Sequence, residues 1–152
     1  MISMNTFFLV RHGETLNNVN KRLSGWVDTP LTQNGLRFIP ALINKLHLID
    51  FQRIYTSDLG RSFITAYEIS RAIKPQLPIY RKEGLREVSY GDVGNMLSTS
   101  AYEMFALLDR DIHFVPPNGE SLEAMQKRVI RAILEIDSEN SDMNILIVAH
   151  SG

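Results

Sequence analysis

Nitrogen-rich side chains follow two apolar runs of this chain directly. Phe7–Val10 has the composition of a buried strand, and Arg11 and His12 come immediately after it. A second run, Asn144–Ala149, is followed in the same way by His150. In an open sheet of parallel strands, ligands bind beyond the carboxyl ends of the strands. The pattern therefore predicts that these three side chains meet at one rim of a sheet.

Arg61 is expected at the same rim. It falls in the first turn of a helix predicted over 58–74, directly after a strand predicted over 53–56. The helix macrodipole disfavours a cation in that turn, which favours an anion as its partner. Arginine presents a planar fork of N–H groups that matches phosphate oxygens two at a time. The cluster thus predicts a site for a small phosphoryl group.

A histidine in such a site can do chemistry as well as bind. Its ordinary pKa is ~6.5, so the neutral ring can accept a phosphoryl group near neutral pH. Transfer to histidine and then to water splits a very slow hydrolysis into two easier steps, and a carboxylic acid must protonate the leaving alkoxide. Glu87, in the loop after the third predicted strand, is the favoured acid. Glu14, directly after Gly13, is the alternative.

The elements that must position these residues alternate between strands and helices. Strands are predicted over 7–10, 53–56, 77–81 and 144–149, and helices over 58–74, 100–109 and 122–138. The expected helix caps are Ser57 for the first, Ser98 or Ser100 for the second and Ser121 for the third. This alternation, with continuous apolar strands, predicts one α/β domain over 1–152. Three layers, α/β/α, would surround a largely parallel central sheet.

One helical pattern contains its own breaker. Leu36, Ile39, Ile43 and Leu46 follow helical spacing, yet Pro40 lies among them. Proline removes a backbone donor and clashes with the preceding turn. We therefore expect either a kinked helix or one that begins near Pro40.

Composition bounds the class of protein. The 152 residues are 44% hydrophobic with a net charge of −1, so there is no basic excess of the kind that nucleic-acid binding requires. The absence of cysteine excludes disulfides, thiolate metal sites and cysteine nucleophiles, and fits a reducing compartment. No apolar run approaches the ~20 residues that span a bilayer, and no secretory signal begins the chain. We expect a cytoplasmic protein with neither nucleic-acid nor membrane partners.

Taken together, the motifs resemble those of a known family, the histidine phosphatase superfamily. That superfamily includes the cofactor-dependent phosphoglycerate mutases and related acid-type phosphatases. Its successive motifs resemble, in order, the segments LVRHGET, GWVDTPLTQNG, YTSDLGRS, LREVSYG, PPNGES and VAHSG. A lone Arg-His-Gly triplet is a weak signal, whereas ordered motifs over essentially the whole chain are a specific one.

The resemblance implies a role for each candidate residue. His12 would be the phosphorylated nucleophile and Glu87 the proton donor. The phosphate pocket would consist of Arg11, Asn18, Arg61 and His150. No metal is implied, and no cofactor either, except 2,3-bisphosphoglycerate if the chain is a mutase.

The expected reaction is hydrolysis of small phosphorylated metabolites. The stretch between Tyr90 and Pro116 is short, whereas the mutases carry longer insertions there that help to exclude water and so return the phosphoryl group to the sugar acid. The segment GWVDTPLT is shared with the mutases, so a phosphoglycerate mutase remains an alternative. A phosphate-binding or regulatory module without turnover is the other alternative.

Two departures from the family pattern bear on these expectations. Residues 92–95 replace a sequence that is usually similar to Trp-Glu-Gly, which predicts a looser loop around Glu87. The chain ends at Gly152, whereas the family continues with a helix and further strand structure beside the first strand. We therefore expect a C-terminally short version of the fold, in which the first strand keeps an unpaired edge through which copies of the chain can associate.

Overall fold

Strands and helices alternate along residues 4–104 and 111–151, the parts of the chain that the computed structural model describes. The strands are β1 (Thr6–Arg11), β2 (Arg53–Thr56), β3 (Ile79–Arg81) and β4 (Asn144–Ala149). The helices are α1 (Leu16–Val19), α2 (Gln33–Leu46), α3 (Gly60–Ile73), α4 (Ser98–Met104) and α5 (Leu122–Ser138), with short 3-10 turns η1 (Glu83–Leu85) and η2 (Gly91–Val93). No helix within these ranges is long and apolar enough to cross a membrane.

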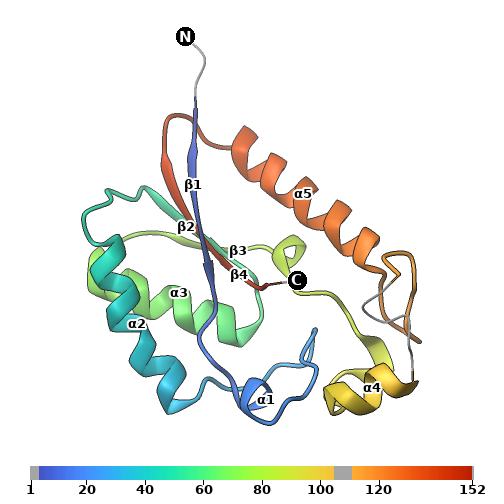
Figure 1. Ribbon diagram of the computed structural model, residues 1–152. Coiled ribbons are helices and arrows are strands. Elements are labelled where there is room, and N and C mark those ends of the chain that lie inside the picture. The colour runs from blue at the N-terminus through green and yellow to red at the C-terminus, as the bar shows by residue number, and fades with distance from the viewer. Residues whose placement is uncertain (1–3, 105–110, 152) are drawn as a thin grey trace.

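The strands form a parallel sheet in the order β1-β4-β2-β3 (Figure 1). β1 and β4 pair along their whole length, with Thr6 opposite Asn144 and Arg11 opposite Ala149. β4 is central, and four of its six residues are buried. β1 lies at one edge of the described sheet, as predicted. Because all strands run the same way, their carboxyl ends share one end of the molecule.

Helices cover both faces of this sheet, which confirms the predicted three-layer α/β/α architecture. Figure 1 shows α2 and α3 on one face and α5 on the other. Alternation along β4 serves both layers: Leu146 and Val148 join the core with α2 and α3, whereas Ile145 and Ile147 join the core with α5. Residues of these two cores on the helices include Ile39, Leu46, Ala66 and Ile69 on one side and Ala132 and Ile136 on the other.

α2 continues through Pro40, so the expectation that it begins near this proline was wrong. The helix starts at Gln33, where the Thr32 hydroxyl accepts a hydrogen bond from the Gly35 amide at 3.0 Å. A proline inside a helix costs about 3 kcal/mol. Ile39 and Leu46 are 3% and 7% exposed, and burying each contributes about 1.5–3 kcal/mol. Packing of the apolar stripe therefore offsets the backbone penalty.

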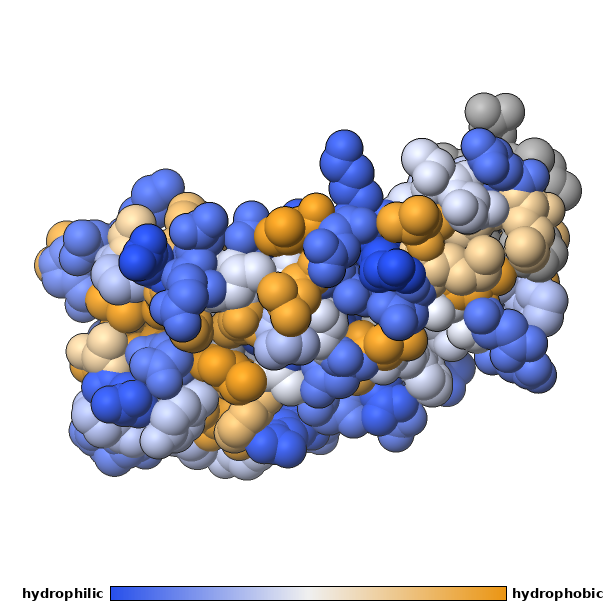
Figure 2. All heavy atoms as spheres, turned by 90° about the horizontal axis from the view of Figure 1, so that it is seen from below, coloured by the Kyte–Doolittle hydropathy of each residue, from blue (hydrophilic) through white to orange (hydrophobic). Residues whose placement is uncertain are grey.

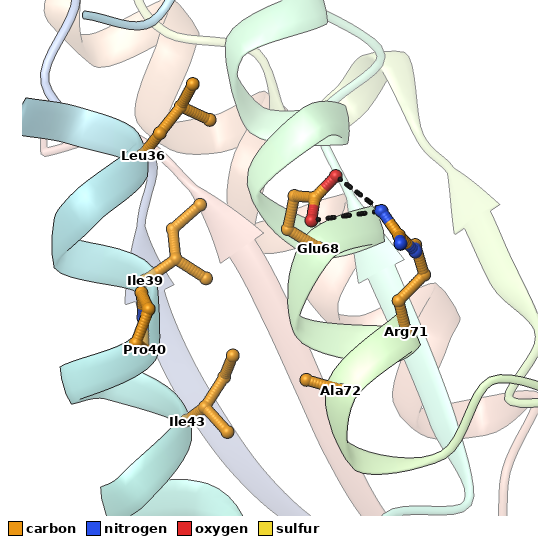
Figure 3. A pocket seen from close by; sticks show the side chains of 7 residues that line it. All are labelled: Leu36, Ile39, Pro40, Ile43, Glu68, Arg71 and Ala72. Carbon is orange, nitrogen blue, oxygen red and sulfur yellow. Dashed lines mark hydrogen bonds and ion pairs between the residues drawn. The ribbon is translucent and has the colours of Figure 1, made fainter. Parts of the chain in front are cut away.

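α2 lies alongside α3 on the sheet, and a shallow furrow runs between them (Figure 3). Leu36, Ile39 and Ile43 of α2 line one side of the furrow. On the α3 side, Arg71 pairs with Glu68 at 3.3 Å. The apolar stripe predicted from helical spacing is thus the surface by which α2 meets its neighbour.

Several predicted boundaries change for local reasons. Ser57 does not cap α3: the N-cap is Leu59, and the Gly60 amide donates instead to the Asp28 carboxylate at 3.0 Å. Ser121 caps α5 as predicted, accepting from the Ala124 amide at 3.0 Å. The third strand begins at Ile79 and not at residue 77, because the amide of residue 77 is used in a turn.

The short helix expected over 100–109 begins at Ser98, so neither Ser98 nor Ser100 precedes it as a cap. Ala101 of this helix is buried with Leu23 and Val93 in a small third core. The rest of the predicted helix, from 105 onwards, lies outside the described residues.

We expect Gly35→Ala to destabilise the fold, although alanine normally improves a helix by about 0.5–1 kcal/mol over glycine. A Cβ at Gly35 would collide with the backbone of Glu14, and one at Gly13 would lie 2.9 Å from the Gly35 carbonyl oxygen. Relief of such a clash costs about 1–3 kcal/mol. Urea unfolding measures the loss. The control is Gln33→Ala, an exposed change in the same turn, which should stay within about 0.5 kcal/mol. An unchanged or raised stability of Gly35→Ala would contradict the close approach.

Candidate active site

The register of β1 and β4 places two histidines side by side. Arg11 and Ala149 are partners in the ladder, and the His12 amide extends it by donating to the Ala149 carbonyl at 3.0 Å. His12 and His150 are therefore the next residues on adjacent strands. Their ring centroids lie 5.1 Å apart. The predicted meeting of these side chains at one rim is a direct consequence of the parallel pairing.

Hydrogen bonds define the tautomer of the His12 ring. Nδ1 lies 2.7 Å from the Gly13 carbonyl oxygen, which can only accept, so Nδ1 carries the proton. Nε2 then holds the lone pair and accepts from Nε of Arg61 at 3.3 Å. Burial, together with the charges of Arg61 and Arg11, lowers the pKa of His12 to about 4. The ring is neutral near pH 7, and its nucleophilic nitrogen faces a guanidinium.

Arg61 is a buried cation held by backbone carbonyls. Its side chain is 1% exposed, and its terminal nitrogens donate to the carbonyl oxygens of Gly25 at 2.6 Å and Val27 at 3.1 Å. Gly25 has φ +50°, a left-handed conformation that favours glycine. Burial lowers the pKa of Arg61, and the carboxylates of Asp28 and Glu87 oppose that shift. This concentration of positive charge favours an anionic ligand.

His150 contributes a second neutral ring to the site. Its Nε2 lies 3.3 Å from the Ser62 hydroxyl, in the first turn of α3. Burial is the main cause that lowers the pKa of His150, followed by the charge of Arg61. Its Nδ1 is buried and has no hydrogen-bond partner in the described part of the chain.

A cavity of about 580 Å³ opens beside these groups and joins the end of β1 to the N-terminal turns of α1 and α2. Its lining consists of Arg11, His12, Gly13, Glu14, Asn18, Asn34, Gly35 and Phe38.

Figure 2 views the molecule from below, where hydrophobic side chains are exposed among polar ones. In residues 4–104 and 111–151, no three or more histidine, aspartate or glutamate side chains form a group that could hold a metal ion.

Asn18 and Glu14 differ in what they offer to the cavity. The Asn18 Oδ1 accepts from the amide of Thr15 at 2.9 Å and from its hydroxyl at 3.0 Å, which leaves the Nδ2 group as a donor. Glu14 accepts from the Thr32 hydroxyl at 2.5 Å. It thereby ties the loop after β1 to the N-cap of α2. Glu14, the alternative acid, is thus engaged in a contact that supports the fold.

Glu87 is carried by a backbone segment that two side chains hold in place. Its carbonyl oxygen accepts from Nε1 of Trp26 at 2.8 Å and from Arg128 at 3.2 Å. Arg128 is itself paired with Glu120 at 2.5 Å. The Glu87 carboxylate accepts from the Val88 amide at 3.0 Å. The charge of this carboxylate acts to raise the pKa of Arg61.

The segment with the substituted residues at 92–95 contacts the turn at 117–120. The Asp92 amide donates to the Pro117 carbonyl at 2.9 Å, and its carboxylate accepts from the Asn118 amide group at 3.0 Å. The Ser89 amide donates to Glu120 at 3.0 Å. Asp92 thus joins the segment after Glu87 to the turn at 117–120, and the looser loop stays a prediction.

The sequence prediction missed residues that support the site from outside. Asp28 caps α3, Ser62 contacts His150, and Glu120 pairs with Arg128. Asp28, Ser62 and Glu120 lie inside the motifs that carry the family resemblance, so those motifs contained a signal for them. Arg128 lies in the middle of α5 and has no signal in its spacing.

Comparisons with known proteins agree on one family. Residues 7–152 match the profile of the histidine phosphatase superfamily (branch 1). The adenosylcobalamin/alpha-ribazole phosphatase of Escherichia coli strain K12 is 32% identical over 150 residues, which cover 95% of this chain and 73% of that protein. The 2,3-bisphosphoglycerate-dependent phosphoglycerate mutase 2 of Gloeobacter violaceus is 31% identical over 150 residues, which cover 93% of this chain and 68% of that protein. The structure of YhfR from Bacillus stearothermophilus superimposes with a TM-score of 0.89 at 33% identity, over 97% of this chain and 74% of that one.

We expect the two neutral histidines to make the fold sensitive to acid. Unfolded histidine has a pKa of ~6.5, whereas that of folded His12 is about 4. Between these values the unfolded chain binds more protons. The contribution of each histidine to the free energy of unfolding is therefore fully present above about pH 6.5. It is lost by up to about 1.4 kcal/mol per pH unit as the pH falls.

Urea unfolding in phosphate-free buffer between about pH 7 and about pH 4 measures this slope. His12→Asn should flatten it, while His47→Asn, at an exposed position, should keep the wild-type slope. Equal slopes in all three proteins would contradict the assignment.

Proposed function

Because the chain belongs to the histidine phosphatase superfamily (branch 1), we propose that it hydrolyses small phosphomonoesters through a phosphohistidine at His12. One observation carries the proposal: Nε2 of a neutral, buried His12 faces Arg61 at 3.3 Å. Arg11 and Asn18 line the cavity into which this site opens. The relative from Escherichia coli that is named a phosphatase supports the same reaction.

Binding in this mechanism uses donors that the fold already orients. Arg11, Arg61 and the Asn18 amide bind the non-bridging phosphoryl oxygens, and Nδ1 of His150 provides a further contact. Carbonyl oxygens hold the Arg61 guanidinium before substrate arrives, so little reorganisation is needed when charge builds up on the oxygens. The dianion in turn neutralises a cation whose burial is otherwise costly.

The first chemical step is transfer to histidine. The lone pair on Nε2 of His12 leaves its hydrogen bond with Nε of Arg61 and forms the bond to phosphorus, while the bond from phosphorus to the ester oxygen breaks. Glu87, as the carboxylic acid, gives its proton to the departing alkoxide oxygen. The hydrogen bond from Nδ1 to Gly13 stabilises the positive charge that develops on the ring.

The second step returns His12 to its starting state. The Glu87 carboxylate, now deprotonated, takes a proton from water as that water attacks phosphorus. The bond between phosphorus and Nε2 breaks, and inorganic phosphate leaves. No metal ion enters either step of this proposal.

A second candidate function is that of a phosphoglycerate mutase dependent on 2,3-bisphosphoglycerate. Relatives named as such mutases, including the one from Gloeobacter violaceus, favour it. A mutase would need the bisphosphate as a primer and would return the phosphoryl group to the sugar acid, whereas a phosphatase needs only water. A phosphate-binding module without turnover is the third outcome that an assay can reveal.

We expect His12→Ala to lose turnover of p-nitrophenyl phosphate and to form no acid-labile phosphoenzyme, because the attacking nitrogen is gone. The assay contains excess EDTA, which tests metal independence, and is repeated with 2,3-bisphosphoglycerate, which tests for a mutase. His47→Ala, an exposed histidine, is the control and should keep wild-type activity. Normal phosphoryl labelling of His12→Ala would sink the mechanism.

We expect Glu87→Gln to lower kcat by about 10²- to 10⁴-fold on an alkyl phosphate, which needs a proton on its leaving oxygen. The loss on p-nitrophenyl phosphate should be smaller, because that leaving group departs without protonation. Glu14→Gln is the matched control, since it removes the alternative acid and leaves Glu87 in place. If Glu14→Gln shows the leaving-group dependence and Glu87→Gln does not, the two roles are reversed.

A further inference from the structure

Arg128 reaches from α5 to the backbone segment that carries Glu87. Its Nη1 donates to the carbonyl oxygens of Gly84 and Arg86, each at 3.0 Å, and its Nη2 donates to that of Glu87 at 3.2 Å. The side chain is 22% exposed. A guanidinium presents its N–H groups in a fixed planar fork, so one side chain can hold several carbonyl oxygens at once. Arg128 therefore holds the backbone immediately before and at Glu87.

The helix that carries Arg128 is itself fixed against this segment. Ala132, one turn after Arg128 on the same face of α5, is 4% exposed in the core that also contains Leu85. A Cβ at Gly84 would lie 2.7 Å from the Ala132 Cβ, so the glycine allows α5 to approach η1 closely. Arg128 thus acts from a support that is packed into the core.

Glu120 orients the guanidinium of Arg128 and holds the chain after Glu87. Its carboxylate accepts from Nη2 of Arg128 at 2.5 Å, from Nε at 3.3 Å and from the Ser89 amide at 3.0 Å. The Glu120 amide donates in return to the Ser89 carbonyl at 3.0 Å. Hydrogen bonds that join charged groups are stronger than neutral ones. The pair of Arg128 and Glu120 therefore fixes the chain on both sides of Glu87.

Trp26 supplies a second donor to the carbonyl oxygen of Glu87. Its Nε1 lies 2.8 Å from this oxygen. The guanidinium carbons of Arg86 and Arg128 lie 4.6 and 5.8 Å from the centroid of the Trp26 ring, within the range of a cation–π contact. Arg86 is in turn paired with Asp58 at 2.6 Å. Side chains from three distant parts of the sequence thus converge on the backbone of one residue.

We propose that Arg128 is a positioning residue for the acid of this reaction. Together with Trp26 it fixes the backbone at Glu87, so that the carboxyl group meets the leaving oxygen of the ester in the first step and water in the second. Arg128 itself takes no part in making or breaking bonds. The inference rests on the proposed function, because it takes Glu87 as the proton donor.

Arg128→Gln tests this role through its dependence on the leaving group. The ratio kcat/KM reports the steps up to the phosphohistidine, so hydrolysis of that intermediate does not enter it. For glycerol 1-phosphate we expect a loss of about 10- to 100-fold, the size that a small misplacement of a catalytic group causes. For p-nitrophenyl phosphate, whose leaving group departs without a proton, the value should stay within about threefold. An equal loss on both esters would overturn the proposal.

A double-mutant cycle with Glu87→Gln shows whether Arg128 acts through Glu87. Once the carboxyl group is gone, its placement no longer matters. Adding Arg128→Gln to Glu87→Gln should therefore change kcat/KM for glycerol 1-phosphate by less than about twofold, because residues that act as a unit are not additive. A loss in this background as large as in the wild type would overturn the proposal.

Further variants separate geometry from charge and from folding. Arg128→Lys keeps the positive charge but loses the planar fork, so it should show most of the loss, and wild-type kinetics of this variant would overturn the proposal. Arg128→Gln combined with Glu120→Gln leaves no unpaired carboxylate and should keep the leaving-group dependence. Trp26→Phe keeps a ring and removes one donor, so it should show the same dependence at about three- to tenfold. Arg131→Gln, exposed on the same helix, is the matched control and should change nothing.

Amide hydrogen exchange separates failure of this inference from failure of the proposed function. In Arg128→Gln the amides of residues 84–89 should exchange about tenfold faster, while those of β1 and β4 keep their wild-type rates. That result supports the positioning of the segment even if the wild type hydrolyses no ester, an outcome that overturns the proposed function alone. Wild-type exchange at 84–89, or an equal increase in β1 and β4, overturns the positioning role whatever the activity.

Discussion

The hydrogen bond from the His12 amide to the Ala149 carbonyl extends the parallel ladder of β1 and β4 by one step beyond both strands. The geometry of the site depends on this extension. It sets two imidazole rings 5.1 Å apart at the end of a strand pair in which four of the six β4 residues are buried. A slip of one residue in this register would turn every side chain of the edge strand to the opposite face. The core residues of β1 and β4 therefore also specify the chemistry.

Around this pair the fold gathers charged and polar groups in one place. Strand ends and the first turn of α3 supply the groups for the phosphoryl end, and Arg61 is kept ionised in a buried position by carbonyl oxygens and by Asp28. Such a buried cation costs stability in the free protein, a cost common to sites that are organised for a charged ligand.

Much of the fold followed from local signals. Hydrophobic runs placed β2 and β4 at their observed bounds, and Ser121 with the apolar stripe after it placed α5, because these patterns need only neighbouring residues to act. Arg11, His12, Arg61 and His150 were predicted to converge because parallel strands end at one rim, and the structure brings them together. The ordered motifs placed the chain in its family, and the comparisons confirm that family.

The tertiary structure decided those features that depend on contacts between residues distant in sequence. Pro40 was expected to kink α2 or to mark its start, and the helix begins before it because Ile39 and Leu46 are buried against elements that local spacing cannot reveal. Ser57 was the local candidate to cap α3, yet Leu59 is the N-cap and the Gly60 amide donates to Asp28, which chain folding brings close. Arg128 reaches Glu87 from α5 in the same way. Spacing along the chain determines the helices and strands and the residues at their ends. Which distant residues contact those ends depends on how the surfaces of the elements pack together.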